Sequence, residues 1–365
     1  MDVFPERLPP GTVLERSPLG AVRAAARSEG RVLLTTPVPQ QQTAWTKARQ
    51  DVHQLLRSWG YQVVEMPARL RPGEWLAALR QLRGHLANGG HLLIEYPFPQ
   101  RRRAYLLSLF SRATGVRLYG LLHDLDSLRF PDSPPRRELA VLSLFDGLVT
   151  HNREMSNWLR EGGLDGRLAE LNLFDYLTDR PPAPCAAQTW STPLKIACCG
   201  NLSWDKAGYV YDPRLADLRG VELDLYGAFF EAGRTPPGPV RFRGVFDPSE
   251  PQLDGRYHFG LVWDGSAAER CSGNYGRYMR YNNPHKLSLY LVLGLPVIVW
   301  RQAAIADFVQ RCGVGVTVND LRELADIPQW VRARDYQEMV RNVAPLAEAA
   351  RRGDFLRDAL VRLLR

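Results

Sequence analysis

Lysine is scarce in this chain of 365 residues. Lys and Arg together number 47, yet the only lysines are Lys47, Lys195, Lys206 and Lys286. Arginine therefore supplies nearly every positive side chain, including those that only need to be solvated. Lysine differs from arginine in presenting a compact, strongly hydrated point charge. We therefore expect the few lysines to be biased toward sites that require such a charge.

Long apolar runs and paired cysteines are also missing. The most hydrophobic stretch, residues 287–300, is interrupted by Gly294 and Pro296 and falls short of the roughly 20 apolar residues that span a bilayer. No basic stretch followed by an apolar segment opens the chain, so we expect no signal peptide and a cytoplasmic location. The five cysteines form no C-x-x-C pair, and the adjacent Cys198 and Cys199 in an apolar run indicate buried thiols.

The formal net charge of +8 favours an anionic partner. Apart from residues 101–103 the basic residues are scattered, and zinc-finger spacing, a basic zipper and an RNA-binding signature are all absent. We therefore expect no nucleic-acid partner. Phosphorylated metabolites and lipid head groups are the partners that this charge still allows.

The length predicts two domains, because it exceeds what one hydrophobic core usually supports. Strand-like runs alternate with helical periodicity, which is typical of doubly wound parallel sheets. Residues 179–193 are rich in proline and small side chains and predict a linker between domains at 1–178 and 194–334. The predicted strands are 31–36, 61–65, 91–96, 117–122, 147–150, 194–199, 222–226, 259–263, 296–300 and 314–318, with 240–245 extended. The predicted helices are 44–59, 74–87, 103–114, 138–143, 284–293 and 303–311.

Residues 335–365 predict an amphipathic helix or helix pair that packs on the protein, with membrane attachment through its arginines as the alternative. The fold class is thus α/β, with two doubly wound, Rossmann-like domains. Such domains place the carboxyl ends of their strands on either side of a cleft, where ligands bind. Functional residues are therefore expected at those strand ends.

The segment 274–299, NYGRYMRYNNPHKLSLYLVLGLPVIV, carries the strongest signal. Asn283 as N-cap and Pro284 as the first helical residue predict a helix start there. His285 and Lys286 then lie in the first turn, where unpaired N–H groups and the helix macrodipole favour a phosphate. Because a lysine there opposes the macrodipole by about 0.5 kcal/mol, we interpret Lys286 as the partner of a bound anion. The alternative is a solvated surface lysine.

Other polar residues follow predicted strands of the second half. Asp264 and Gly265 come after residues 259–263, and Asp264 either contacts sugar hydroxyls or caps a turn. Asn201 belongs to a Gly-Asn turn that lets the backbone approach a ligand, and Lys206 could then reach a diphosphate.

In the first half, His123, Asp124 and Asp126 follow the strand 117–122. The D-x-D spacing of the two aspartates would suit a metal ion on a nucleotide diphosphate. This spacing is common by chance and lies in the half without the phosphate-binding helix, so we expect no metal and no other cofactor. His123 is the better candidate for acceptor binding or proton transfer, with a structural histidine as the alternative.

The combination of GLVWDG, the 274–299 segment with the following tryptophan, and AAIADFV resembles bacterial galactofuranosyltransferases and related glucosyltransferases, which use UDP-sugars and have the GT-B fold. LLHDLDSLR, LNLFDYL and GNLSWDKAG support this resemblance, which covers about residues 40–320. It implies that the final helix packs on the first domain and that loop 244–251, with Phe246, flanks the uracil. It also implies a diphosphate and sugar site formed by Tyr281, Asn282, Asn283, His285 and Lys286, with Asp264 and Gly265 in the donor pocket. The chain departs from the family in its extension before Arg31 and in its arginine content.

The resemblance predicts a hexosyltransferase that moves galactofuranose or glucose from a UDP-sugar to a saccharide, glycoprotein or lipid-linked glycan in cell-surface glycan synthesis. Breaking the anomeric bond leaves charge on the diphosphate, which Lys286 and Lys206 would stabilise. His123 or Asp126 is the candidate base. A non-catalytic UDP-sugar-binding protein is the alternative, whereas a dinucleotide-dependent isomerase is disfavoured because no G-x-G-x-x-G follows the first strand. Peripheral contact with the inner membrane face and homo-oligomerisation are further expectations.

Overall fold

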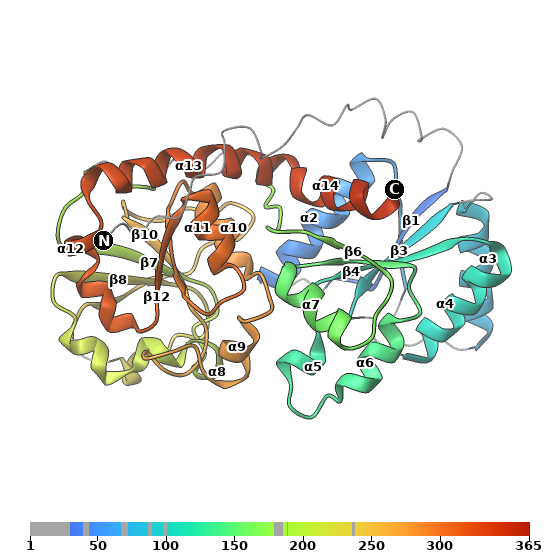
Figure 1. Ribbon diagram of the computed structural model, residues 1–365, viewed down its shortest axis with the longest axis horizontal. Helices are drawn as coiled ribbons and strands as arrows, with labels where there is room; N and C mark the ends of the chain where they lie inside the picture. Colours follow the sequence, from blue (N-terminus) through green and yellow to red (C-terminus); the bar gives the residue numbers. More distant parts are fainter. Residues whose placement is uncertain are drawn as a thin grey trace.

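The computed structural model describes residues 30–38, 44–66, 72–86, 90–97, 101–178, 185–187, 189–235 and 238–365. Within these ranges the chain forms two six-stranded sheets in which neighbouring strands are parallel (Figure 1). Alternate residues of the first strand enter different apolar clusters, since Val32 and Leu34 pack in one and Leu33 in the other. Both faces of that sheet are thus buried, which explains why its strands read as apolar runs.

The first sheet has the strand order β2-β1-β3-β4-β5-β6. Its strands are β1 (Arg31–Thr35), β2 (Gln62–Glu65), β3 (His91–Tyr96), β4 (Arg117–Leu122), β5 (Gly147–Thr150) and β6 (Arg167–Glu170). The helices between them are α2 (Ala44–Ser58), α3 (Pro72–His85), α4 (Arg101–Thr114), α5 (Asp126–Arg129), α6 (Pro135–Leu142) and α7 (Arg153–Glu161).

The second sheet has the order β12-β11-β10-β7-β8-β9. Its strands are β7 (Leu194–Cys199), β8 (Val221–Tyr226), β9 (Val240–Gly244), β10 (Phe259–Val262), β11 (Val297–Trp300) and β12 (Gly315–Val318). Its helices are α8 (Trp204–Ala207), α9 (Gly273–Tyr278), α10 (His285–Val292), α11 (Ala306–Cys312) and α12 (Ile327–Trp330). The cysteines are free and Cys198 and Cys199 are buried, as the sequence predicted.

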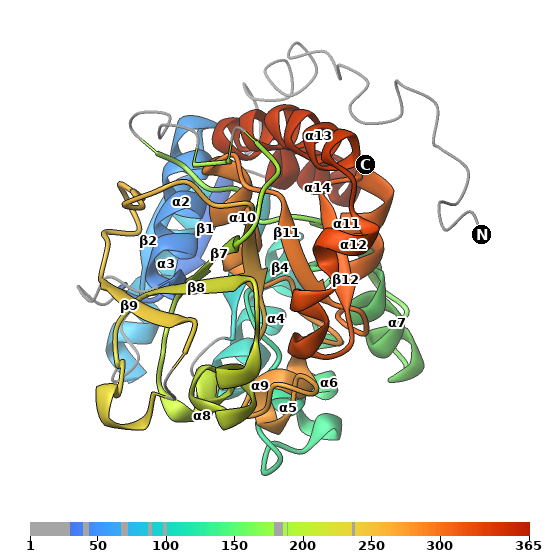
Figure 2. The same cartoon turned by 90° about the vertical axis from the view of Figure 1, so that its left-hand side faces the viewer.

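The chain ends in a helix pair that joins the two domains. α13 (Ala333–Arg352) packs on α10 of the second domain, and α14 (Asp354–Leu364) lies against β5 and β6 of the first sheet (Figures 1 and 2). Gly353 separates the two helices with φ 77°, and a Cβ there would lie 2.3 Å from Leu55 in α2. Glycine is therefore required at this junction.

Three arginines of this helix pair form ion pairs within the chain. Arg352 and Arg357 both pair with Asp354, and Arg362 pairs with Asp358, so these charges are already engaged within the chain. No helix among the described residues is long and apolar enough to cross a membrane.

Three elements of the first domain escaped the sequence prediction, namely α5, α7 and β6. β6 is a four-residue edge strand that begins with the exposed Arg167, so it lacks an apolar run. In the second domain α9 was missed because Gly273 and Gly276 disfavour a helix by propensity. All four elements nevertheless matter, because the segments around them form the contact between the domains.

Candidate functional site between the two domains

Asn283 is the hub of the contact between the domains. Its side-chain amide donates to the carbonyl oxygens of His151 (2.6 Å) and Asn172 (3.0 Å), and its oxygen accepts from Asn152 Nδ2 (2.7 Å). The helix N-cap is Pro284 rather than Asn283, and α10 begins one residue later than predicted. The N-cap prediction is therefore wrong. Because its amide is fully engaged, Asn283 is placed to join the domains rather than to hold a diphosphate.

Tyr281 and Asn282 precede this hub. Tyr281 packs against the apolar cluster of the first domain, and its carbonyl oxygen accepts from Asn152 Nδ2 at 2.9 Å. Asn282 differs, because its buried Oδ1 has no hydrogen-bond partner among the described residues. An unpaired buried oxygen is costly, so Asn282 is the better of the two as a ligand-binding residue.

Lys286 lies in the first turn of α10, as predicted, but it has a partner within the chain. Its Nζ donates to Asp264 Oδ1 at 2.7 Å and to the carbonyl oxygen of Trp263 at 3.0 Å. The carboxylate of Asp264 thus already compensates this charge, and the low exposure of Lys286 contradicts the alternative of a solvated surface lysine. The Lys286–Asp264 pair lies at the carboxyl end of β10. Gly200, at the end of β7, is close by, because a Cβ added to Gly200 would lie 3.9 Å from Lys286 Cε.

Lys206 approaches the same strand ends from α8. Its carbonyl oxygen accepts from the Gly265 N–H at 2.7 Å, and its Nζ lies 5.1 Å from the ring centre of Tyr275. Gly265 has φ 117°, and a Cβ there would meet the Ser272 carbonyl oxygen at 2.2 Å, so the loop requires glycine. Burial lowers the pKa of Lys206, and the positive charge of Lys286 acts in the same direction. Two of the four lysines therefore converge on one place.

Asn201 and Phe246 lie further along the ends of the second sheet. Asn201 is exposed and its Oδ1 accepts from the Ser203 N–H at 2.8 Å, which makes it a turn residue. Phe246 lines an open cavity of about 300 Å³ after β9, together with Tyr226 and Arg243. A cavity of this size, with an aromatic side chain and polar groups, can take a planar heterocycle.

The ring of Phe174 brings three histidines together across the interface. It stacks on His123 with centroids 6.2 Å apart, and it meets His151 and His285 edge-on at 4.9 and 6.0 Å. His123 and His151 follow strands of the first sheet, whereas His285 opens α10 of the second domain. His285 also stacks on Tyr176 at 4.8 Å.

His285 is held as a neutral imidazole. Burial lowers its pKa to about 3, with the charge of Lys47 as a second cause. Its Nε2 is buried and has no hydrogen-bond partner in the described part of the chain. His285 therefore presents an unsatisfied polar atom between the domains, as a substrate-binding residue would.

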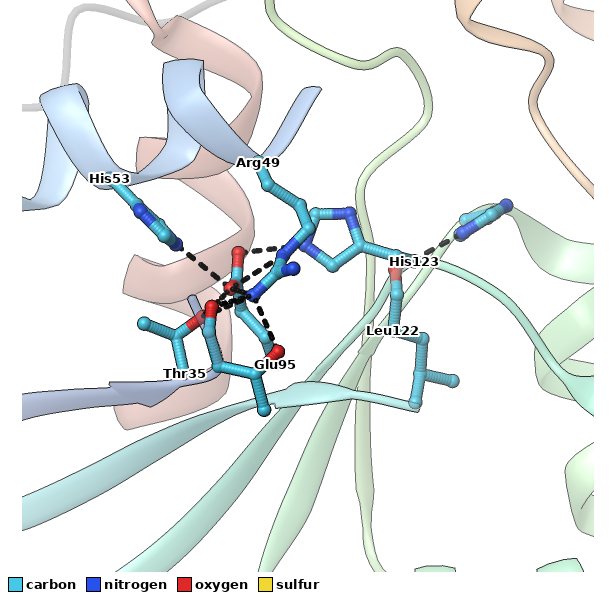
Figure 3. Close-up of polar contacts among 8 residues, drawn as sticks. Thr35, Arg49, His53, Glu95, Leu122 and His123 are labelled. Carbon is cyan, nitrogen blue, oxygen red and sulfur yellow. Dashed lines mark hydrogen bonds and ion pairs between the residues drawn. The ribbon is translucent and has the colours of Figure 1, made fainter. Parts of the chain in front are cut away.

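His123 is anchored by Glu95, which the sequence analysis did not single out. His123 Nε2 lies 2.9 Å from Glu95 Oε1, and His53 Nε2 lies 2.9 Å from Oε2 (Figure 3). The same Oε2 accepts from the Thr35 hydroxyl and from Arg49 (3.1 Å). All these side chains are buried, and they come from α2 and from the carboxyl ends of β1, β3 and β4.

The hydrogen bonds to Glu95 determine where the proton sits on His123. Burial by itself raises the pKa of Glu95, but hydrogen bonds from His123 and His53 outweigh it and hold the pKa well below its ordinary value. The ionised carboxylate can only accept, so Nε2 of His123 carries the hydrogen. In the neutral ring Nδ1 then has a free lone pair, which makes it a proton acceptor.

Asp126 lies in a different environment from His123. It opens α5, its N–H donates to Glu138 Oε1 at 2.9 Å, and burial followed by the charge of Glu138 raises its pKa. Asp124 is paired with Arg129 at 2.5 Å. The D-x-D spacing therefore reflects two aspartates with separate partners. Glu138 binds the backbone N–H of Asp126, whereas Glu95 binds the imidazole of His123 itself.

Acidification below about pH 6.5 is expected to destabilise the fold through His151. Its Nε2 lies 3.1 Å from the Leu122 carbonyl oxygen and its Nδ1 accepts the Asn283 N–H at 3.1 Å, so both ring nitrogens are used by the neutral form. Burial lowers its pKa from 6.5 to about 3, with the charge of His123 as a second cause. The unfolded chain therefore binds the proton first, and the stability present above pH 6.5 is lost as the pH falls toward 3.

The expected loss at pH 5.5 is about 1.4 kcal/mol, one pH unit below the unfolded value. Thermal unfolding of the wild type and of His151→Gln at about pH 7.5 and about pH 5.5 measures it. The fall in Tm between these conditions should be smaller in the variant. Asp51, whose pKa burial raises to about 6, acts in the opposite direction but is common to both proteins. An equal fall in both would contradict the assignment.

Two family models match the two domains of this chain. The family model for the N-terminal domain of glucosyltransferase 3-like proteins matches residues 31–173. The family model for their C-terminal domain matches residues 196–363. Beta-1,6-galactofuranosyltransferase WbbI of Escherichia coli strain K12 is 30% identical over 278 residues, which cover 75% of this chain and 79% of that protein. The chain belongs to the glucosyltransferase 3-like family.

Other relatives agree with this family. Glucosyltransferase 3 of Streptococcus gordonii is 30% identical over 102 residues, 28% of this chain and 30% of that protein. The apo structure of OtsA covers 92% of this chain and 99% of its own at 10% identity with a TM-score of 0.55. A trehalose-phosphate synthase from Burkholderia xenovorans covers 92% and 100% at 11% identity with a TM-score of 0.52. These two likenesses show the fold, and the predicted GT-B architecture is confirmed.

As a member of the glucosyltransferase 3-like family the chain is a glycosyltransferase, as the sequence predicted, and the non-catalytic alternative is not favoured. The structure adds residues that the sequence analysis passed over, namely Glu95, His151, Phe174 and Arg129. For Glu95 a signal existed, since a carboxylate stands inside the apolar strand HLLIEY. Phe174 lies in LNLFDYL, but nothing in that segment predicts which rings it touches.

Proposed function

We propose that this chain transfers a hexosyl group, galactofuranosyl or glucosyl, from a UDP-sugar to a hydroxyl of a saccharide or glycoconjugate. The observation that carries the proposal is the convergence of Lys286 and Lys206 on the ends of β7 and β10, opposite a histidine of the first domain that is oriented by a buried carboxylate. The relatives named above, a galactofuranosyltransferase and a glucosyltransferase, support the class of transferred group.

The donor would lie along the ends of the second sheet. Its uracil enters the cavity beside Phe246, and its diphosphate reaches Lys206 and Lys286. The glycine loop at Gly200 leaves room for the backbone to approach the phosphates. Asn282 and His285 each offer a buried, unpaired polar atom to the donor sugar. Since the lysines supply the positive charge, the proposal requires no metal ion.

In the reaction the acceptor oxygen forms a bond to the anomeric carbon, and the bond from that carbon to the diphosphate breaks with its electron pair. The proton of the acceptor hydroxyl passes to Nδ1 of His123, while Nε2–H remains bonded to Glu95. Negative charge grows on the leaving diphosphate, where Lys206 and Lys286 stabilise it. Binding energy that appears only as this charge develops lowers the barrier.

Lys206→Ala and Lys286→Ala should each raise the Kd for UDP by about tenfold or more, because each removes one charge-assisted contact to phosphate. Isothermal titration with UDP measures the effect. Lys195→Ala is the matched control, since Lys195 is exposed on β7 and its loss changes the net charge equally. Unchanged UDP affinity in both site variants would remove the lysines from the donor site.

Loss of Lys286 should also lower stability, because Asp264 would be left buried without its ion pair. The double variant Lys286→Ala/Asp264→Asn removes both charges and separates this effect from UDP binding. Turnover is tested by UDP release from UDP-galactofuranose, UDP-glucose, UDP-galactose and UDP-N-acetylglucosamine with and without saccharide acceptors. A protein that binds UDP but releases none from any donor would point back to the binding-protein alternative.

A further inference from the structure

Two positive side chains from different domains lie against one aromatic ring. The guanidinium carbon of Arg129, in α5 of the first domain, is 5.6 Å from the ring centre of Tyr275, and Lys206 Nζ of the second domain is 5.1 Å from it. Arg129 is also 5.9 Å from the ring centre of Tyr278. α5 and α9 are in contact here, and the Leu125 N–H donates to Tyr278 Oη at 3.0 Å. Like charges are thus brought together at the point where the domains meet.

One buried donor of Arg129 has no acceptor in the described part of the chain. Its Nη1 binds Asp124 at 2.5 Å, but its Nε is buried and has no hydrogen-bond partner among the described residues. A buried N–H without an acceptor costs about 1–3 kcal/mol. Asp124 alone therefore does not satisfy this guanidinium, and Lys206 brings a second positive charge to the same ring.

We propose that Arg129 is a ligand of the donor diphosphate supplied by the first domain, which completes the phosphate site across the interdomain cleft. This inference rests on the proposed function and deepens it. The planar guanidinium offers parallel N–H groups that match phosphate oxygens, whereas the lysines act as point charges. The positive charge of Arg129 also contributes, after burial, to the lowered pKa of Lys206, which a bound diphosphate would reverse.

A first-domain ligand has a mechanical consequence. The uracil cavity and both lysines belong to the second domain. If they alone held the donor, its affinity would not depend on the position of the first domain. A contact from Arg129 makes donor affinity depend on how α5 meets α9. His123 follows β4 only a few residues before Arg129, so the same contact also sets its position relative to the anomeric carbon.

Titration of Arg129→Gln and Asp124→Asn with UDP and with uridine tests the proposal. We expect Arg129→Gln to raise the Kd for UDP by about tenfold and to leave uridine binding unchanged, because uridine lacks the phosphates. Asp124→Asn should bind UDP as well as the wild type or better, since it frees Nη1 of Arg129. Arg112→Gln, which removes an exposed arginine of α4, is the matched control.

The pair of variants separates a ligand from a structural ion pair. If Arg129 acted only by holding Asp124, both variants would weaken UDP and uridine binding to the same extent, and that result would overturn the proposal. Wild-type UDP affinity in Arg129→Gln would also overturn it while leaving the proposed function intact. A wild-type protein that binds no UDP would overturn both. If Arg129→Gln does not fold, Arg129→Lys takes its place in the titration. Lysine can keep the ion pair with Asp124 but lacks the planar guanidinium, so UDP binding should still be weaker than in the wild type.

Discussion

His123→Gln is expected to lower kcat by about 10²–10⁴-fold, the range that a general base contributes. The amide of glutamine can accept a hydrogen bond from the acceptor hydroxyl but cannot take up its proton. Substrate binding should change little, because the uracil cavity and the lysines lie in the other domain. Initial rates of UDP release, measured with the donor and acceptor on which the wild type turns over, give kcat and KM separately.

The matched control for His123 is His85→Gln, because His85 is exposed at the end of α3. It should show wild-type kinetics. A fall in kcat/KM that comes entirely from KM, with kcat unchanged, would show that His123 binds substrate rather than accepting its proton.

The fold could be predicted from the sequence because its strands are buried on both faces. Runs such as HLLIEY in β3 and LKIACC in β7 are apolar without alternation, and helical periodicity separates them. The prediction missed elements whose amino-acid composition does not follow from burial. β6 is an edge strand with one buried residue in four, and α9 is held by contacts with the first domain rather than by helix propensity.

Only part of the candidate site could be predicted from the sequence. Lys286 and Lys206 stand out because lysine is rare in this chain, and the structure brings both to one place. Roles set by partners far along the chain could not be predicted. Asn283 reads as a helix cap, but its partners lie 111 to 132 residues away. The same holds for Arg129, whose ring partner Tyr275 belongs to the other domain.

Glu95→Ala should lower the free energy of unfolding by about 3–5 kcal/mol, because it removes the single acceptor that several buried donors share. Arg49 would remain in the core with its charge uncompensated, and the two histidines would lose their anchor. Denaturant unfolding of the purified chain measures the loss. Glu338→Ala on the exposed face of α13 is the control and should be nearly neutral. A change for Glu95→Ala no larger than for Glu338→Ala would contradict a role for the carboxylate in the core.

Glu95→Gln tests the same carboxylate without emptying its site. Among the described residues, Oε2 accepts from three side chains and Oε1 from His123 alone. The glutamine oxygen should therefore take the Oε2 position, and its NH₂ should face His123. His123 Nε2 must then accept, so the hydrogen moves to Nδ1 and the lone pair for the acceptor proton is lost. We expect kcat to fall by about 10²–10⁴-fold with KM nearly unchanged, as a carboxylate-to-amide change does where it fixes the wrong tautomer. Full kcat in a folded Glu95→Gln protein would mean that Glu95 holds the domain together without setting the proton on His123.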